Sequence, residues 1–180
     1  LTPKSDRTLK TILFFLSHQP NPRFIKQINY LAQGNKVVVI YFSRAALPDL
    51  NSNLDGSVRC FSMGQIESSG RYISRLMSYT KALGNLWRCR RQVRADAVIV
   101  NNIDVLLLEA LMRVLTLRSP RVVLEVSDLP QYVFGRDAAA RLFKAIDAML
   151  VRLFVDRLIV TSRRYYDVYY ARFFQRPHLE

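Results

Sequence analysis

The stretch TILFFLSHQPNPRFIKQINYLAQGNKVVVIYF, residues 11–42, decides the fold of this chain. It opens on the apolar run 11–16, which predicts a strand buried on both faces. After the polar loop SHQPNP, apolar residues recur at helical spacing between Pro22 and Gly34, which are typical start and stop residues. The β-branched run 36–42 predicts a second strand. Strand, helix and strand in this order predict a parallel pair joined by a crossover helix.

The rest of the chain repeats this alternation. Further strands are predicted at residues 58–63, 97–100, 121–126 and 157–160, and helices at residues 66–93, 103–117, 138–154 and 162–174. The strands are apolar on both faces, so helices must cover both sides of the sheet. We therefore expect an α/β fold: a three-layer, Rossmann-like open parallel sheet of about six strands, ordered 3-2-1-4-5-6 by analogy with that fold.

The composition is that of one globular domain. The 180 residues are 50% hydrophobic with only 6 Gly and 7 Pro, which excludes disordered and collagen-like chains. No uncharged apolar run is long enough to span a bilayer, and the N-terminus lacks the pattern of a signal peptide. We expect a flexible segment at residues 1–9, one domain at residues 10–176, and a tail at residues 177–180 whose end resembles a cloning remnant.

Polar residues follow the predicted strands where each strand ends. In open α/β sheets ligands bind beyond these carboxyl ends, so the sequence predicts a polar cleft of sugar or nucleotide size. Capping of the following helices is the alternative for any single residue. The candidates are Ser17, His18, Asn21, Ser43, Arg44, Asn101, Asn102, Asp104, Ser127, Asp128, Thr161 and Ser162.

Several classes of enzyme are excluded by missing motifs. The first loop is SHQPNP, without the GxGxxG of NAD or FAD enzymes, and no GxxxxGK[ST] loop of ATPases or GTPases is present. No GxSxG elbow marks a serine hydrolase. Cys60 and Cys89 have neither disulfide-framework nor zinc-site spacing, so no metal site is predicted.

Four segments in order resemble the N-terminal domain of family 4 glycosyltransferases. They are NPRFIKQINYLAQGNKVVVIYF, ADAVIVNNIDVLLLEALM, RVVLEVSDLP and VDRLIVTS, which together reach from strand one to strand six. The resemblance implies the acceptor-side half of a two-domain GT-B enzyme. Such an enzyme transfers a sugar with retention, without a metal or further cofactor, from a nucleotide-sugar to a polysaccharide or lipid-linked acceptor.

The resemblance also implies that most donor contacts come from a C-terminal domain absent from this chain, so the fragment is expected to be inactive alone. It implies a substrate or catalytic role for Asp128. Ser17 and His18 stand where many relatives have two glycines, and Ser127 stands where many have a histidine. The substrate-binding candidates are Ser17, His18, Asn21, Arg23, Asn102, Asp104, Ser127 and Ser162. The alternative is a non-catalytic basic module that binds an anionic polymer or membrane.

The net charge of +13 is concentrated in one segment. Between Glu67 and Asp96 there are seven bases and no acid. On a helix, Thr80, Leu83 and Trp87 would face the core and the bases would face outward. A solvated outer face is one interpretation; docking to an anionic membrane is the other, placing the protein in the cytoplasm, peripheral at the inner face of the plasma membrane. No motif supports nucleic-acid binding. The membrane-surface candidates are Arg71, Arg75, Lys81, Arg88, Arg90 and Arg91.

The last predicted helix carries two aromatic rows. One row is expected to pack on the sheet, and the other to meet the absent domain, a membrane or a second copy. The rows are Tyr165, Tyr169 and Phe173, and Tyr166, Tyr170 and Phe174.

Overall fold

The computed structural model describes residues 9–43, 53–65, 72–176 and 178–179. The predicted flexible segment 1–9 lies almost wholly outside these residues, as do Arg44 and Arg71. Within them the chain forms a seven-stranded sheet in the order β3-β2-β1-β4-β5-β6-β7, and every neighbouring pair is parallel. The strands are β1 (Thr11–Leu16), β2 (Lys36–Ser43), β3 (Arg59–Gln65), β4 (Ala97–Val100), β5 (Arg121–Val126), β6 (Arg157–Val160) and β7 (His178–Leu179).

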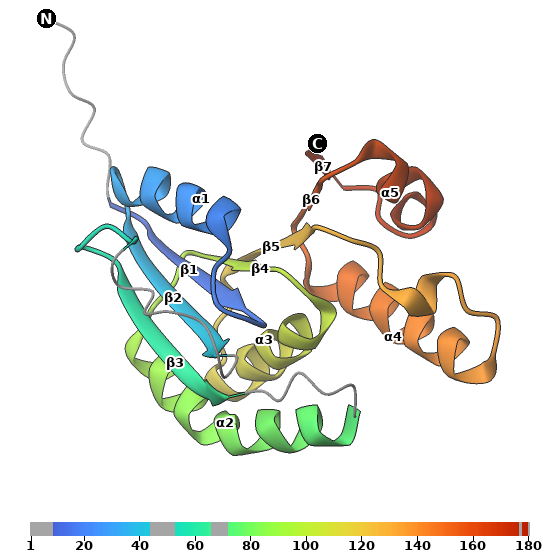
Figure 1. Ribbon diagram of the computed structural model, residues 1–180, viewed down its shortest axis with the longest axis horizontal. Coiled ribbons are helices and arrows are strands. Elements are labelled where there is room, and N and C mark those ends of the chain that lie inside the picture. Colours follow the sequence, from blue (N-terminus) through green and yellow to red (C-terminus); the bar gives the residue numbers. More distant parts are fainter. Residues whose placement is uncertain (1–8, 44–52, 66–71, 177, 180) are drawn as a thin grey trace, which may run out of the picture.

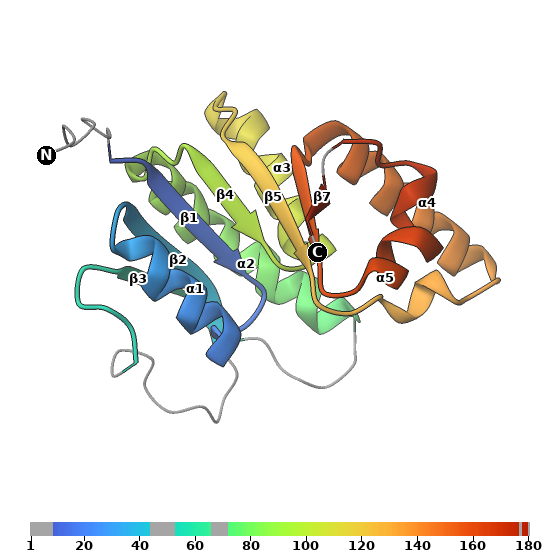
Figure 2. The ribbon, with the colours of Figure 1, turned by 90° about the horizontal axis from the view of Figure 1, so that it is seen from above.

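Helices lie on both faces of this sheet (Figures 1 and 2). One face packs against α1, around Phe14, Phe24 and Ile28. The other face carries the larger core beneath α2, α3 and α4. The helices are α1 (Pro22–Ala32), α2 (Tyr72–Gln92), α3 (Ile103–Thr116), α4 (Ala138–Phe154) and α5 (Arg163–Val168), with short 3-10 turns η2 (Gln131–Val133) and η3 (Tyr170–Arg172). The predicted fold class and strand order are confirmed.

Two aspartates fix the amino ends of the strands in register. Asp96, just before β4, accepts a hydrogen bond from the backbone N–H of Thr11 at 2.7 Å. Asp156, just before β6, accepts one from the backbone N–H of Val122 at 2.8 Å. The sequences ADAVIV and VDRLIV therefore share a physical reason: the acid ties each strand to its neighbour. β1 and β4 pair at the point where the strand order reverses.

The last helix differs from its prediction. A continuous helix was expected over 162–174, but α5 ends at Val168 and Tyr169 adopts φ −126° and ψ −58° before η3. The break buries Tyr169, Tyr170 and Phe174, each less than 7% exposed, and leaves Tyr165, Tyr166 and Phe173 half-buried. Each row thus has at least one ring in the core, so the expected outward aromatic row is wrong.

The C-terminal segment and α2 also differ from expectation. Where a tail was expected, His178–Leu179 forms β7 and pairs with β6. In α2 the buried residues are Ala82, Leu86, Cys89 and Arg90, whereas Trp87, predicted for the core, is 39% exposed. Thr80 is exposed as well. The helix is rotated from the predicted orientation because it buries Arg90 against an acid of α3, described below.

Candidate functional site

The carboxyl ends of β1 and β4 bring three polar residues together. Asn101 Oδ1 accepts a hydrogen bond from the backbone N–H of Ser17 at 2.9 Å. Asn101 Nδ2 lies 3.3 Å from His18 Nδ1, and Ser17 Oγ lies 3.1 Å from the same ring nitrogen. These three side chains meet at the switch point of the sheet, which is where ligands of open α/β folds bind. Their convergence was expected from the strand ends and is the centre of the candidate site.

The orientation of Asn101 sets the tautomer of His18. Because Oδ1 of Asn101 accepts from the Ser17 backbone, the Nδ2 amide group of Asn101 faces the imidazole and donates to Nδ1 of His18. Nδ1 is then an acceptor, and the proton of the neutral ring lies on Nε2. The arrangement holds the ring by its Nδ1 side.

Three other candidates in this region have structural partners. Asn102 is the N-cap of α3, with its Oδ1 accepting from the backbone N–H of Ile103 at 2.8 Å. Asp104 Oδ2 accepts a hydrogen bond from the hydroxyl of Tyr79 on α2 at 3.2 Å. Asn21 likewise caps α1, accepting from Phe24 N at 3.0 Å. The capping alternative therefore holds for Asn21 and Asn102, whose role at the cleft is to orient the two helices.

Asp128 lies at the mouth of a small hollow beyond β4 and β5. It lines this hollow together with Asn101 and Asn102, and its side chain is exposed. Ser127 precedes Asp128, and its carbonyl accepts a hydrogen bond from Thr161 Oγ1 at 2.8 Å, which ties the β5 loop to the end of β6. Ser162 stands at the N-cap position of α5 without a side-chain capping bond. Asp128 is thus an exposed acid beside Asn101, and the buried Asp147 lines the same hollow.

Arg23 is held at the first turn of α1 by a buried acid of β5. Its Nη2 lies 2.7 Å from Glu125 Oε1, and Gln27 Nε2 donates to the same oxygen at 3.4 Å. Glu125 is 1% exposed and Arg23 is 41% exposed. Burial raises the pKa of the Glu125 carboxyl, and the Arg23 guanidinium opposes that rise. The acid therefore anchors one end of the Arg23 guanidinium, while the rest of this side chain remains accessible at the surface.

Glu125 and a second buried acid, Asp147, were missed by the sequence analysis. Asp147 on α4 is 1% exposed and accepts a hydrogen bond from the Tyr132 hydroxyl at 3.0 Å. Burial raises the pKa of its carboxyl above the ordinary value. A signal was present for each: Glu125 is an acid inside the apolar run RVVLEV, and Asp147 shares a helical face with buried Ala140 and Val151.

The basic face predicted for α2 is present in part. Lys81, Arg88 and Arg91 are exposed, and the Arg91 guanidinium lies 4.7 Å from the centre of the Trp87 ring. Arg71 and the side chain of Arg75 lie outside the described part of the chain. Arg90 does not belong to this face.

The Arg90 prediction is corrected by its burial. The side chain is 1% exposed, and its Nη2 lies 2.7 Å from Oε1 of Glu109 on α3, which is fully buried. Arg90 therefore joins α2 to α3 inside the protein and contacts no outside surface. The signal for this pairing was an acid on the buried face of α3, beside Val105 and Met112.

Next to α2, the outward faces of α3 and α4 are apolar, which the sequence analysis did not anticipate. Large hydrophobic side chains on these faces are between 39% and 64% exposed: Leu107, Leu111, Val114 and Leu115 on α3, and Leu142, Met149 and Leu153 on α4. The acids within these two helices are directed elsewhere, since Glu109 and Asp147 are buried and Asp104 bonds to Tyr79. One helical layer thus combines an exposed basic helix with an exposed apolar surface.

Among the residues that the structure describes, no helix is both long and apolar enough to cross a membrane. Within the same residues, His, Cys, Asp and Glu side chains form no group of three or more suited to hold a metal ion.

Comparison with known proteins identifies the fold. No protein-family model and no curated protein match the sequence. Among solved structures, the lipopolysaccharide outer core galactosyltransferase WaaB, in its apo form, matches 92% of this chain and 43% of its own chain, with a TM-score of 0.60 at 11% identity. HepE from Anabaena, in complex with UDP-glucose, matches 90% of this chain and 40% of its own, with a TM-score of 0.56 at 13% identity.

A third solved structure is UGT73P12 of Glycyrrhiza uralensis, complexed with glycyrrhetinic acid 3-O-monoglucuronide. It matches 95% of this chain and 48% of its own, with a TM-score of 0.58 at 9% identity. The chain therefore has the Rossmann-like fold found in GT-B glycosyltransferases and spans less than half the length of each of these three. The resemblance to one half of such an enzyme is confirmed at the level of fold.

Proposed function

We propose that this chain is the N-terminal, acceptor-side half of a glycosyltransferase that uses a nucleotide-sugar donor. The observation that carries the proposal is the polar cluster of Ser17, His18 and Asn101 at the strand switch point of a GT-B-like domain. The similar structures include a galactosyltransferase and a complex with UDP-glucose, so the same class of donor is proposed here.

In the proposed reaction the sugar passes with retention to a polysaccharide or lipid-linked acceptor. The acceptor oxygen forms a bond to the anomeric carbon while the bond from that carbon to the donor phosphate breaks. The acceptor proton passes to the departing phosphate, so no protein base is required. His18 and Asp128 would hold acceptor hydroxyls, and Arg23, anchored by Glu125, would contact an anionic group.

The remaining parts of the proposed site come from elsewhere. Most contacts to the nucleotide-sugar would be made by a second domain following this one. This chain spans less than half of each similar glycosyltransferase, which supports the proposal. The donor is then the substrate, with no separate cofactor. This chain alone would hold an acceptor but not complete the reaction.

Asp128 provides the first test of this function. The protein comprising this chain and its second domain is screened for sugar transfer from a panel of nucleotide-sugars, with Asp128→Asn beside it. We expect transfer by the wild type and at least a tenfold lower rate for Asp128→Asn, because the lost charge weakens the hold on an acceptor hydroxyl.

The matched control is Asp167→Asn, which removes an exposed acid of α5 whose partner is Arg163 at 3.8 Å. It should transfer sugar at the wild-type rate. Equal rates for the two variants would remove Asp128 from the site. A wild-type protein that transfers no sugar but adsorbs to anionic polymers would favour the non-catalytic alternative.

We further propose that the helical layer of α2, α3 and α4 rests on an anionic membrane, at the cytoplasmic face where lipid-linked acceptors are found. Lys81, Arg88 and Arg91 would meet the headgroups, and each base near such a surface contributes about 1 kcal/mol. The exposed apolar side chains of α3 and α4 would enter the boundary between headgroups and acyl chains.

A further inference from the structure

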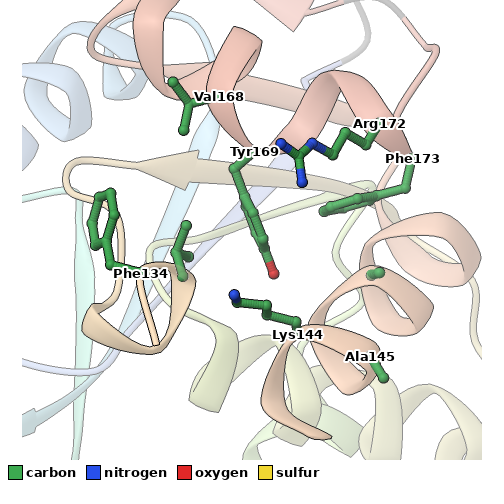
Figure 3. A pocket seen from close by; sticks show the side chains of 9 residues that line it. Phe134, Lys144, Ala145, Val168, Tyr169, Arg172 and Phe173 are labelled. Atoms are coloured by element: carbon green, nitrogen blue, oxygen red, sulfur yellow. The ribbon is translucent and has the colours of Figure 1, made fainter. Parts of the chain in front are cut away.

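An apolar groove of about 380 Å³ opens beside α4 (Figure 3), and its lining includes no residue of the Asn101 cluster. This volume is in the range of small-molecule sites. Its charged lining residues are both bases, Lys144 and Arg172. The full lining is Val133, Phe134, Lys144, Ala145, Ala148, Val168, Tyr169, Arg172 and Phe173.

The groove exists because small residues of α4 face a broken helix. Ala145 and Ala148 leave space where larger side chains would contact α5. The break at Tyr169 then turns η3 so that Arg172 and Phe173 reach the rim (Figure 3). Phe134 and Val168 remain 67% and 41% exposed, so apolar surface lies open along the groove.

A second hollow of about 330 Å³ shares Arg172 and Phe173 with the groove. It is also lined by Arg152 and Arg176, so three arginines line this hollow. Arg152 is held by its Nε donating to the Phe173 carbonyl at 3.3 Å. Arg176 donates to the Val155 carbonyl at 2.7 Å and has Asp156 at 3.8 Å.

We propose that groove and hollow together bind an anionic amphiphile, a phosphate ester of an apolar chain. The phosphate would lie against Arg152 and Arg172, because guanidinium groups match phosphate oxygens in shape and charge. The chain would run along Ala148, Val168 and Phe134. Bases at one end and apolar walls at the other match the two parts of such a molecule.

The apolar end of the groove and the hollow beside Asp128 are lined by consecutive residues. Tyr132 lines the hollow beside Asp128, and the next residue, Val133, lines the groove. The arginines lie at the other end, where Arg176 donates to the carbonyl of Val155 just before β6, so the phosphate would lie away from the cleft loop. The binding of this amphiphile does not rest on the proposed function.

Calorimetric titration of this chain with dodecyl phosphate, below its critical micelle concentration, tests the site. We expect saturable binding of one molecule per chain, and no such binding of inorganic phosphate or the neutral dodecyl maltoside. Arg172→Gln should weaken binding about tenfold, through loss of a charged hydrogen bond. Phe134→Ser should weaken it several-fold, through loss of apolar contact. Both side chains are exposed, so the fold is expected to persist.

The matched controls are Arg164→Gln on α5 and Tyr30→Ser on α1, which are exposed outside the groove. Both should bind dodecyl phosphate as the wild type does. Absence of saturable binding, equal binding of dodecyl maltoside, or equal affinity of Arg172→Gln and Arg164→Gln would overturn the proposal. Sugar transfer without dodecyl phosphate binding would overturn this site alone, whereas binding without transfer by the two-domain protein would overturn the proposed function alone.

Discussion

Arg90 and Glu109 form an ion pair inside the protein, at a distance of 2.7 Å between Nη2 and Oε1. Removing two charges from water is costly, and the pair leaves Arg90 Nε and Nη1 and Glu109 Oε2 without hydrogen-bond partners. Burial raises the pKa of Glu109, and the Arg90 charge opposes this rise. The pair therefore specifies how α2 sits on α3 more than it stabilises the fold.

Breaking the pair on one side should be strongly destabilising. Arg90→Met leaves Glu109 buried without its partner, so we expect the free energy of unfolding in urea to fall by about 3–5 kcal/mol. Arg88 is exposed and lies two residues before Arg90 in α2. Arg88→Met should change the free energy of unfolding by less than about 0.5 kcal/mol. Similar unfolding midpoints for the two variants would show that the buried pair is not formed.

Asp147 should make stability depend on pH. Burial raises its pKa above the ordinary 3.8, so the folded state favours the protonated carboxyl. Stability is then lost as pH rises from this ordinary value through the raised one, because the folded state binds the extra proton.

Asp147→Asn should remove this loss while keeping an oxygen that accepts from Tyr132. In urea unfolding at several pH values, the variant should match the wild type near pH 3.5, about where the unfolded carboxyl begins to ionise, and exceed it at neutral pH. The control Asp167→Asn should show no such growing difference. A constant difference at all pH values would contradict the burial assigned to this carboxyl.

At the scale of elements, the charge of α2 should govern adsorption to anionic vesicles. Replacing Lys81, Arg88 and Arg91 by Gln should weaken co-sedimentation with phosphatidylserine-containing vesicles about a hundredfold at low salt, from about 1 kcal/mol for each base. The matched control replaces Lys26, Lys36 and Arg59, exposed bases of α1, β2 and β3, and should bind nearly as the wild type does. Equal losses in both triple variants would indicate adsorption by net charge, without a defined surface.

Most elements could be predicted from the sequence because their apolar periodicity is strong. The expected bounds of β4, β5, β6 and α4 agree with the structure to the residue. The break at Tyr169 could not be predicted, since the aromatic residues suit a continuous helix until both Tyr169 and Tyr170 find places in the core. The two-residue β7 is too short to give a period of its own.

The candidate site was predictable in position but not in detail. Ser17, His18 and Asn101 follow directly from the rule that strand ends gather at one edge. The pattern marks Glu125 and Glu109 as acids on buried faces, but their partners Arg23 and Arg90 could not be inferred from it. Each ion pair joins residues distant in sequence, so the partner becomes evident only when the strands and helices are placed.

In the whole molecule, the candidate site and the basic helix α2 lie at different places. The polar cluster lies at the carboxyl ends of β1 and β4, whereas the exposed bases of α2 lie on the helical layer beneath the sheet (Figure 1). The chain matches less than half of each similar glycosyltransferase. We therefore expect this domain to supply one half of a site for sugar transfer.

Release of nucleotide from a panel of nucleotide-sugars, with acceptor lipid extract present, tests this claim most directly. The measurement compares this chain, the proposed second domain, and the two joined in one polypeptide. We predict turnover by the joined protein alone, because the cleft needs both halves. Turnover by this chain without the second domain, or no turnover by the joined protein with any donor, would contradict the account.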